Sequence, residues 1–255
     1  MKQLFPKLRK EIRVSILIVS CLLLWGFVET RHQSKTCQKL VISFAQDTQL
    51  DNYFLDEEDI KRLMSEDGRH TIIGEAHQKL SVKALEERIR TNAYVAGCQV
   101  SRNVKGDLFV QITQKRPIAR FVRDEKPDFY IDSLASLMPV VRKYTSRVLT
   151  VTREDSQELP NFELETADKQ LLHLLRALYA EPFFRAQIAH IHVDKYKQAY
   201  LYPQIGKQTV EFGSLFDIDN KLKKLKVFYD EILPLKGWNA YKRINLKYDH
   251  QIICE

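Results

Sequence analysis

Residues that could support metal or acid–base chemistry occur at only a few points in this 255-residue sequence. Four carboxylates run from Asp56 to Asp59 in FLDEEDIKRLM. Such a cluster could bind a metal ion or act as an acid–base pair. However, an aspartate before a helix caps it, and acids in the first turn interact favourably with the helix dipole. Because Ile60, Leu63 and Met64 follow at helical spacing, we interpret the cluster as the start of a helix.

Two histidines, His190 and His192 in IAHIHVD, would lie on the same side of a strand. A zinc site would need at least one more ligand, and no HExxH motif is present, so we interpret the pair as exposed strand residues. The DIDN stretch around Asp217 lacks the glycine and the later glutamate of a calcium loop. The sequence contains no phosphate-binding loop, dinucleotide motif or nucleophile motif. We therefore expect no enzymatic activity, cofactor, metal or small-molecule substrate.

Composition and charge indicate a folded body joined to a basic N-terminal stretch. Eight glycines and eight prolines are few for a linker-rich protein, and eleven tyrosines and thirteen phenylalanines suit a packed core. The net charge is +7, but five of the 40 basic residues and only one of the 33 acidic residues fall in residues 1–28. The remainder is nearly neutral and has no basic stripe, so we expect no binding to nucleic acid.

An uncharged stretch, residues 14–28, follows this basic start. As a helix rising about 1.5 Å per residue it would be about 22 Å long, short for a membrane span but usable. A cleaved signal peptide would need small residues before the cut, whereas this stretch ends in WGFVE. The basic residues upstream also disfavour a buried core helix, so we predict a retained signal anchor with a cytoplasmic N-terminus. The residues taken to mark the span are Val14, Leu22, Trp25 and Val28.

The four cysteines give no disulfide framework. Cys21 falls within the uncharged stretch and is interpreted as a small apolar residue. Cys37, Cys98 and Cys254 would lie outside the cytoplasm, in an oxidising compartment where disulfides can form. Because three is an odd number, at least one of them stays free, pairs between chains or is buried.

The first folded block should contain three strands and two helices. We predict a strand at Leu40–Phe44, a helix after Asp56, and a helix capped by Ser81 with Val82, Leu85 and Ile89 on one face. Two further strands are predicted at Gln99–Val104 and Leu108–Thr113, with a turn at Lys105–Asp107. Pro117 is predicted to end the second of these strands and to mark a boundary.

The second block alternates strands with two long helices. PDFYIDSLASLMPVV predicts a hairpin-like pair, and Arg147–Thr152 predicts another strand. A leucine-rich helix should end at Pro182, and a three-strand meander should end at Gly213. A further helix begins near Asp217 and is stopped by Pro234 and Gly237. The apolar face of the leucine-rich helix comprises Leu171, Leu172, Leu174, Leu175 and Leu178.

The final stretch, YKRINLKYDHQIICE, alternates with a period of two. Its alternate residues are Ile244, Leu246, Tyr248, His250, Ile252 and Cys254. This pattern predicts one continuous strand with an apolar face. Because nothing follows it in the sequence, we expect its outer edge to be left open for another chain.

Several strings across nearly the whole sequence resemble the bacterial cell-division family FtsQ/DivIB, and more narrowly the versions found in Bacteroidetes-type bacteria. The C-terminal strings are the most specific, whereas the apolar stretch alone would fit many families. The strings are FLDEEDIKRLM, QITQKRPIARF, FYID…LMPV…YTSRV, PQIGKQTVEFG, KLKKLKVFYDEILPLKGWNAYKRINLKY and QIIC.

The resemblance implies an α+β protein with one N-terminal transmembrane helix, a POTRA domain (β-α-α-β-β) and a mainly antiparallel β domain with helices packed on it. The protein would lie in the inner membrane at the division septum, with its body in the periplasm. Its partners would be FtsB-like and FtsL-like bitopic division proteins and other divisome proteins, and it would help control septal peptidoglycan synthesis. The implied parts are a cytoplasmic tail (1–13), the anchor (14–28), a linker (29–36), the POTRA domain (37–116) and the FtsQ-type β domain (117–255).

The resemblance also implies a role for the alternating terminal segment. In the family, the last strands and the helix before them contact FtsB, which adds a strand to the sheet. Tyr248 matches a family position that packs against the partner, and Lys247 matches one expected to meet an acidic side chain. The closing HQIICE differs from the better-known members, which have small residues and a tryptophan there. The expected partner-binding residues are Ile244, Leu246, Lys247, Tyr248, His250 and Ile252.

Three alternatives stay open at this point. Leu246 and Tyr248 could be ordinary core residues of the last strand. The chain could be another POTRA-bearing module, used in polypeptide transport or outer-membrane protein assembly, although that class predicts several POTRA repeats or an appended barrel. It could also be a membrane-tethered periplasmic enzyme such as a cell-wall hydrolase, which would need a nucleophile or metal constellation that the sequence does not contain.

Overall fold

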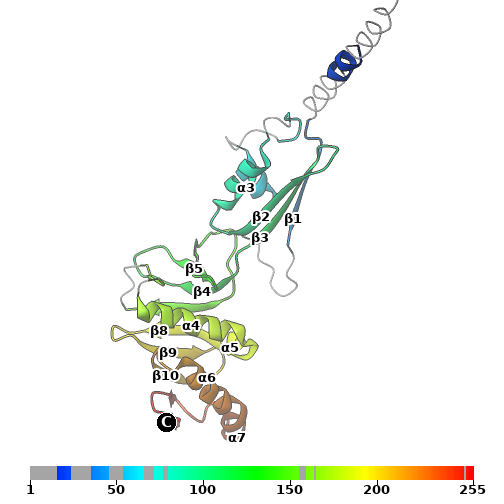
Figure 1. Cartoon of the computed structure of the whole chain (residues 1–255). Helices are drawn as coiled ribbons and strands as arrows, with labels where there is room; N and C mark the ends of the chain where they lie inside the picture. The colour runs from blue at the N-terminus through cyan, green and yellow to red at the C-terminus, as the bar shows by residue number, and fades with distance from the viewer. Residues whose placement is uncertain are drawn as a thin grey trace, which may run out of the picture. The chain divides into compact units, whose positions relative to one another are not determined.

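The computed structural model of the chain divides into two compact units (Figure 1). The first unit comprises Met1–Asp51 and Leu55–Gln114, and the second comprises Asn52–Phe54 and Lys115–Glu255. The structure describes residues 16–23, 36–45, 54–65, 72–76, 80–154, 159–163, 165–249 and 251–255.

The first unit contains a three-stranded sheet with two helices. In chain order its elements are β1 (Leu40–Phe44), α2 (Glu57–Met64), α3 (Val82–Arg90), β2 (Val95–Arg102) and β3 (Leu108–Gln114). The strand order is β1-β3-β2, with β1 parallel and β2 antiparallel to β3. The predicted order of strand, two helices and two strands is therefore confirmed, although β2 begins four residues before the predicted start.

The carboxylate cluster of the first unit is a helix cap. The Asp56 carboxylate accepts a hydrogen bond of 2.8 Å from the Asp59 backbone, and the Asp59 carboxylate accepts one of 3.1 Å from the Asp56 backbone. This reciprocal capping box satisfies two N–H groups at the start of α2. Ser81 caps α3 by accepting a hydrogen bond of 3.3 Å from the Ala84 backbone. The prediction that these acids start a helix is confirmed.

The second unit contains a nine-stranded mixed sheet. Its order is β12-β11-β10-β9-β8-β7-β4-β5-β6, with five antiparallel and three parallel pairings. The strands are β4 (Pro117–Phe121), β5 (Phe129–Asp132), β6 (Leu137–Pro139), β7 (Leu149–Arg153), β8 (Ile188–Val193), β9 (Gln198–Pro203), β10 (Thr209–Ser214), β11 (Arg243–Asn245) and β12 (Ile253–Cys254).

Helices connect two of the parallel strand pairs in this unit. The connection from β7 to β8 runs through α4 (Thr166–Ala180) and α5 (Pro182–Gln187). The connection from β10 to β11 runs through α6 (Ile218–Val227), the π-helical stretch η1 (Phe228–Ile232) and α7 (Leu233–Lys236). Two parallel strands can be neighbours only if a connection of this length carries the chain back to the same end of the sheet. The helical segment between β10 and β11 does this.

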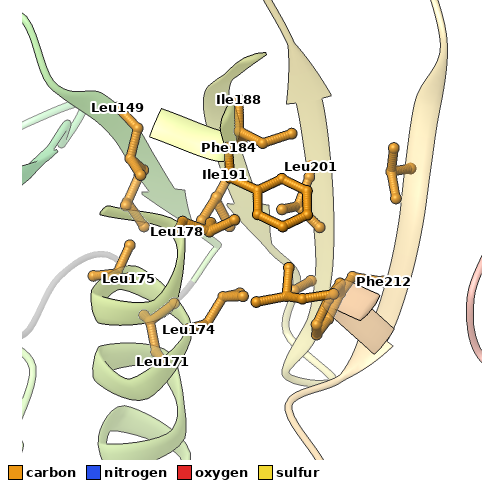
Figure 2. Close-up of a cluster of buried hydrophobic side chains, with 14 of the residues drawn as sticks. Leu149, Leu171, Leu174, Leu175, Leu178, Phe184, Ile188, Ile191, Leu201 and Phe212 are labelled. Atoms are coloured by element: carbon orange, nitrogen blue, oxygen red, sulfur yellow. The ribbon is translucent and has the colours of Figure 1, made fainter. Parts of the chain in front are cut away.

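The core of the second unit lies between α4, α5, α6 and one face of the sheet. Figure 2 shows Leu171, Leu174, Leu175 and Leu178 of α4 pointing toward side chains from the strands. A buried ion pair of 2.9 Å between Arg153 of β7 and Asp168 of α4 fixes this helix further. The strand and α5 residues labelled in the same view are Leu149, Phe184, Ile188, Ile191, Leu201 and Phe212.

Three predictions about these elements need correction. Pro117 does not end a strand: β3 ends at Gln114, and Pro117 is the first residue of β4, a position where proline is tolerated. The helix beginning near Asp217 is not uniform, because η1 interrupts it before α7. The predicted single terminal strand is instead two short strands, β11 and β12.

Little of the expected membrane anchor lies within the described residues. Residues 16–23 are helical, and Leu22 within them is exposed. Val14, Trp25 and Val28 lie outside the described residues. Of the helices that the structure describes, none is long and apolar enough to cross a membrane.

Candidate partner-binding edge

The C-terminal edge of the nine-stranded sheet is a short hairpin. β11 pairs in parallel with β10, with Val210 opposite Ile244. On its other side β11 pairs antiparallel with β12, with Ile244 opposite Cys254 and Asn245 opposite Ile253. The expectation of an open edge along one strand from Ile244 to Cys254 is therefore wrong, because the segment turns back and covers β11 itself.

The backbone pairing in this hairpin leaves a very short outer edge. The Arg243 and Glu255 backbones exchange two hydrogen bonds of 3.0 Å each. In an antiparallel ladder, the residue between two hydrogen-bonded pairs turns its N–H and C=O the other way. The outward-facing backbone groups of β12 are therefore those of Cys254, since Ile253 and Glu255 face β11.

The apolar residues in and just after β11 belong to the core. Ile244 and Leu246 are each 0% exposed, and both pack in the main hydrophobic cluster of the unit. The Leu246 N–H donates to the Glu211 carbonyl at 3.0 Å, which extends the pairing with β10 beyond β11. A partner could not touch these two side chains without rearranging the edge. These two buried side chains instead hold β11 in place.

Four charged side chains lie on the opposite face of the same edge. The Glu211 carboxylate of β10 accepts a hydrogen bond of 2.9 Å from Arg243 Nε, and Lys247 Nζ lies 3.1 Å from it. Burial alone would raise the pKa of Glu211, but the hydrogen bonds and charges of Lys247 and Arg243 outweigh it and lower the pKa. Arg243 also contacts the Glu255 carboxylate at 3.4 Å. Lys247, expected to meet an acidic partner, thus already has an acidic neighbour in its own sheet.

Gly213 leaves room for Lys247 at this edge. Its φ of +76° lies in the left-handed region, next to the irregularity where β10 pairs with β9. A Cβ at this position would lie 2.6 Å from Cγ of Lys247. Any side chain here would therefore displace Lys247, whose ammonium also lies 5.8 Å from the centre of the Tyr200 ring.

The turn after β11 is held by a lysine of α6. Lys224 Nζ donates to the Tyr248 carbonyl at 2.7 Å and lies 3.5 Å from the Leu246 carbonyl. Tyr248 is 51% exposed, so it is available to another molecule. Ile252 is partly buried against the core, and His250 lies outside the described residues.

The structure gathers only some of the predicted partner-binding residues on an accessible surface. Tyr248 is exposed, Lys247 is half-exposed and paired, and Ile244 and Leu246 are buried. Sequence reasoning missed Glu211, Arg243, Glu255 and Lys224, which organise this edge. The alternation of TVEFG does place Glu211 on the polar face of its strand, but no local pattern links it to residues more than thirty positions later.

Comparisons with known protein families identify the chain. A family model described as "FtsQ/DivIB, C-terminal related" matches residues 116–255, more than half of the chain. The chain belongs to the FtsQ/DivIB family. A second model, described as "POTRA-like domain", matches residues 35–113. The FtsQ/DivIB resemblance drawn from the sequence is therefore confirmed, while a search of curated proteins found no match.

FtsQ/DivIB proteins are cell-division scaffolds that carry out no chemistry of their own. In this member of the family, the matched C-terminal part includes the β11–β12 hairpin and its charged face. The matched part thus includes the edge of a sheet. The chemistry such an edge offers is backbone pairing and ionic contact.

His190 and His192, the pair considered as metal ligands, are hydrogen-bonded on the polar face of the sheet. His190 lies 2.8 Å from the Thr150 hydroxyl and 3.1 Å from the Thr152 hydroxyl, which also contacts His192 at 3.0 Å. Both rings are partly buried rather than exposed. Burial and the neighbouring His192 lower the pKa of His190. Within the described residues, no group of three or more metal-ligating side chains is arranged to hold an ion.

Proposed function

We propose that the protein is a non-enzymatic divisome scaffold that binds FtsB-like and FtsL-like bitopic proteins at its C-terminal sheet edge and helps control septal peptidoglycan synthesis. The observation that carries the proposal is the FtsQ/DivIB match over residues 116–255, the part of the chain that includes this edge. In this proposal residues 37–116 act as the POTRA domain and residues 117–255 as the FtsQ-type β domain.

The chemistry of the edge supports a protein partner. Backbone groups at a sheet edge can pair with an extended segment, and alternate side chains then fix its register. Exposed Tyr248 supplies an aromatic group of the kind that often anchors protein interfaces. The mixed charges of Arg243, Lys247 and Glu211 add ionic contacts that would favour one partner over another.

The location of the protein is also part of the proposal. Residues 14–28 would form a single membrane anchor, with residues 1–13 in the cytoplasm and the two folded units in the periplasm at the septum. The excess of basic residues before the apolar stretch supports this orientation. Small bitopic partners anchored in the same membrane would then meet the protein within the periplasm.

Site-specific photocrosslinking in living cells tests the partner. A photoreactive amino acid at Tyr248 should capture the FtsB-like protein. The same amino acid at Leu134, which is 79% exposed in the turn between β5 and β6 at the far end of the same sheet, serves as the matched control. Equal capture at both positions, or capture of neither division protein at Tyr248, would contradict the proposed binding edge.

Depletion of the protein tests the scaffold role independently of the edge. We expect depleted cells to grow as filaments or chains, because division would stall while growth continues. Normal septation after clean deletion, in a strain without a second copy of the gene, would contradict the role in division.

A further inference from the structure

The hairpin that closes the C-terminal edge places a segment of the chain where an added strand would pair. β12 lies antiparallel to β11, with Cys254 opposite Ile244 and Ile253 opposite Asn245. Cys254 is partly buried and packs against the core, whereas Ile253 is 37% exposed on the other face. Glu255 then reaches Arg243, so this short strand combines backbone pairing, one apolar contact and one ionic contact.

We propose that β12 is a placeholder for the partner's strand: the incoming segment displaces residues 253–255 and pairs with β11 instead of adding outside β12. This inference rests on the proposed function, since it specifies how the same partner binds. It differs from simple addition because the edge has a closed form, with β12 in place, and an open form.

The short length of β12 favours displacement over addition. The strand has two residues, and of these only Cys254 turns its backbone N–H and C=O outward. A strand added outside it would gain few ladder hydrogen bonds. On β11 the same strand could pair with both Arg243 and Asn245, directly above the buried side chain of Ile244.

The side-chain ion pair at the end of β12 contributes little to holding it. The ion pair between Arg243 and Glu255 joins side chains that are 52% and 62% exposed, and exposed pairs contribute little to stability. The turn before β12 is held differently, because Lys224 binds the Tyr248 carbonyl and Leu246 is buried. Opening can therefore be limited to the residues after this turn, leaving β11 in the sheet.

The placeholder also indicates the kind of segment that would replace it. Arg243 and Lys247 share the single carboxylate of Glu211, so removing Glu255 leaves two basic groups beside one acid. The replacing strand should run antiparallel to β11. It should carry an apolar residue opposite Ile244 and an acidic residue, one position further along, beside Arg243.

A disulfide across the hairpin tests displacement directly. In full-length protein carrying Cys254→Ser, the changes Asn245→Cys and Ile253→Cys place two thiols on directly paired residues, within the usual reach of a disulfide. The probe is the purified periplasmic segment of the FtsB-like protein from the same organism. Oxidation should weaken binding at least about tenfold because it removes the open form, and reductant should restore it.

Deleting residues 253–255, the segment that would be displaced, provides the opposite test. If β12 competes with the partner, its removal should strengthen binding, by up to the factor by which the closed form outweighs the open form. Arg243→Gln should weaken binding and reduce its salt dependence, whereas Lys242→Gln, a change at the neighbouring exposed base, serves as the control.

The outcomes separate the two proposals. Equal binding by the oxidised and reduced forms would overturn the placeholder while leaving the partner correct, and so would loss of binding on deletion in a protein that still unfolds cooperatively. If no form of the protein binds the FtsB-like segment, the proposed partner is wrong and the placeholder proposal falls with it. The oxidised and reduced forms have the same sequence, so a folding defect cannot imitate the expected result.

Discussion

The two sheets of the molecule close an edge in different ways. At β2 of the POTRA-like unit, α3 supplies side chains: Glu86 accepts a hydrogen bond of 2.7 Å from the Val100 N–H, and Arg90 donates one of 2.8 Å to the Cys98 carbonyl. At β11 of the C-terminal unit, the closing groups are backbone groups of β12. Both arrangements satisfy edge N–H and C=O groups that could otherwise pair with another chain.

The difference indicates at which edge an incoming strand can replace the groups that close it. Charged side chains on a helix block a strand without resembling one, and α3 would have to move to release them. The two-residue strand β12 pairs with β11 in the same way as a partner strand would. An extended segment with suitable side chains can therefore take its place. The far end of the nine-stranded sheet shows a third solution, because β6 is three residues long and ends at Pro139, which has no N–H to offer.

The largest expected effect concerns β11, which should be a permanent part of the fold. Leu246→Ala should lower the free energy of unfolding by about 2–5 kcal/mol, since it removes a fully buried side chain beside β11. Trp238, which lies 6.2 Å from Tyr229 in the same unit, reports unfolding in denaturant by fluorescence. Tyr248→Ala, at a 51% exposed position, should change stability by no more than about 0.5 kcal/mol. If both variants lost a similar free energy of unfolding, the exposed Tyr248 would contribute to folding as much as the buried Leu246, which would contradict this prediction.

The next effect concerns the edge of β2. Glu86→Ala should destabilise the POTRA-like unit by about 1.5–3 kcal/mol, because a charged acceptor is removed from the Val100 N–H. Hydrogen exchange followed by mass spectrometry should show faster exchange at Val100. Glu87→Ala is the matched control, because the Glu87 side chain is 67% exposed, and it should leave this amide unchanged. Unchanged exchange in both variants would contradict the view that α3 closes this edge.

Thiol labelling compares the two edges within one protein. Burial raises the pKa of both the Cys98 and the Cys254 thiols, so neither should react quickly with a maleimide at neutral pH. Cys254 should nevertheless react well before Cys98, because β12 can open while β2 lies between β3 and the side chains of α3. Peptide mapping after timed labelling measures both rates. Equal rates would show that β12 is held as firmly as β2.

Local patterns predicted the elements whose cause is local. The caps at Asp56 and Ser81 and the apolar spacing after each predicted α2 and α3, and the short segments Leu40–Phe44 and Leu108–Thr113 predicted β1 and β3. These features depend on residues within a few positions of one another. The spatial order β1-β3-β2 was not predicted, because none of these local patterns says which strands pair.

The terminal hairpin could not be predicted from alternation alone. Ile244 and Leu246 lie before the turn, and Ile252 and Cys254 after it, yet all four occupy even positions. A turn that preserves this parity gives the same period-two pattern as one long strand. The turn region also contains neither glycine nor proline, and its common turn-forming residues are Asn245, whose side chain accepts a hydrogen bond of 2.9 Å from the Lys247 N–H, and Asp249.

The charged face could not be predicted because it depends on a parallel crossover. Glu211 and Arg243 are 32 positions apart and meet only because α6, η1 and α7 carry the chain back beside β10. No spacing rule in the sequence encodes that meeting. The family resemblance implied that Lys247 would meet an acidic side chain of a partner, and no pattern in the sequence indicated that Glu211 already lies 3.1 Å from it.

The smallest expected effect is the pH dependence contributed by Glu211 to the C-terminal edge. Its pKa in the folded protein is lower than the ordinary value of 4.5, so its pairing with Arg243 and Lys247 stabilises the fold above that value. This contribution should be lost as the pH falls through the folded pKa, because the carboxylate then becomes neutral. The effect should be modest, since the Lys247 and Arg243 side chains are 37% and 52% exposed and therefore screened by salt.

Denaturant unfolding followed by Trp238 fluorescence tests this contribution. Below pH 4.5, the free energy of unfolding of Glu211→Gln should decline less steeply than that of the natural sequence. Glu231→Gln, at an exposed position on η1, should decline as the natural sequence does. If Glu211→Gln also matched the natural sequence at every pH, the charged face would contribute nothing to closing this edge, and the hairpin would depend on backbone pairing alone.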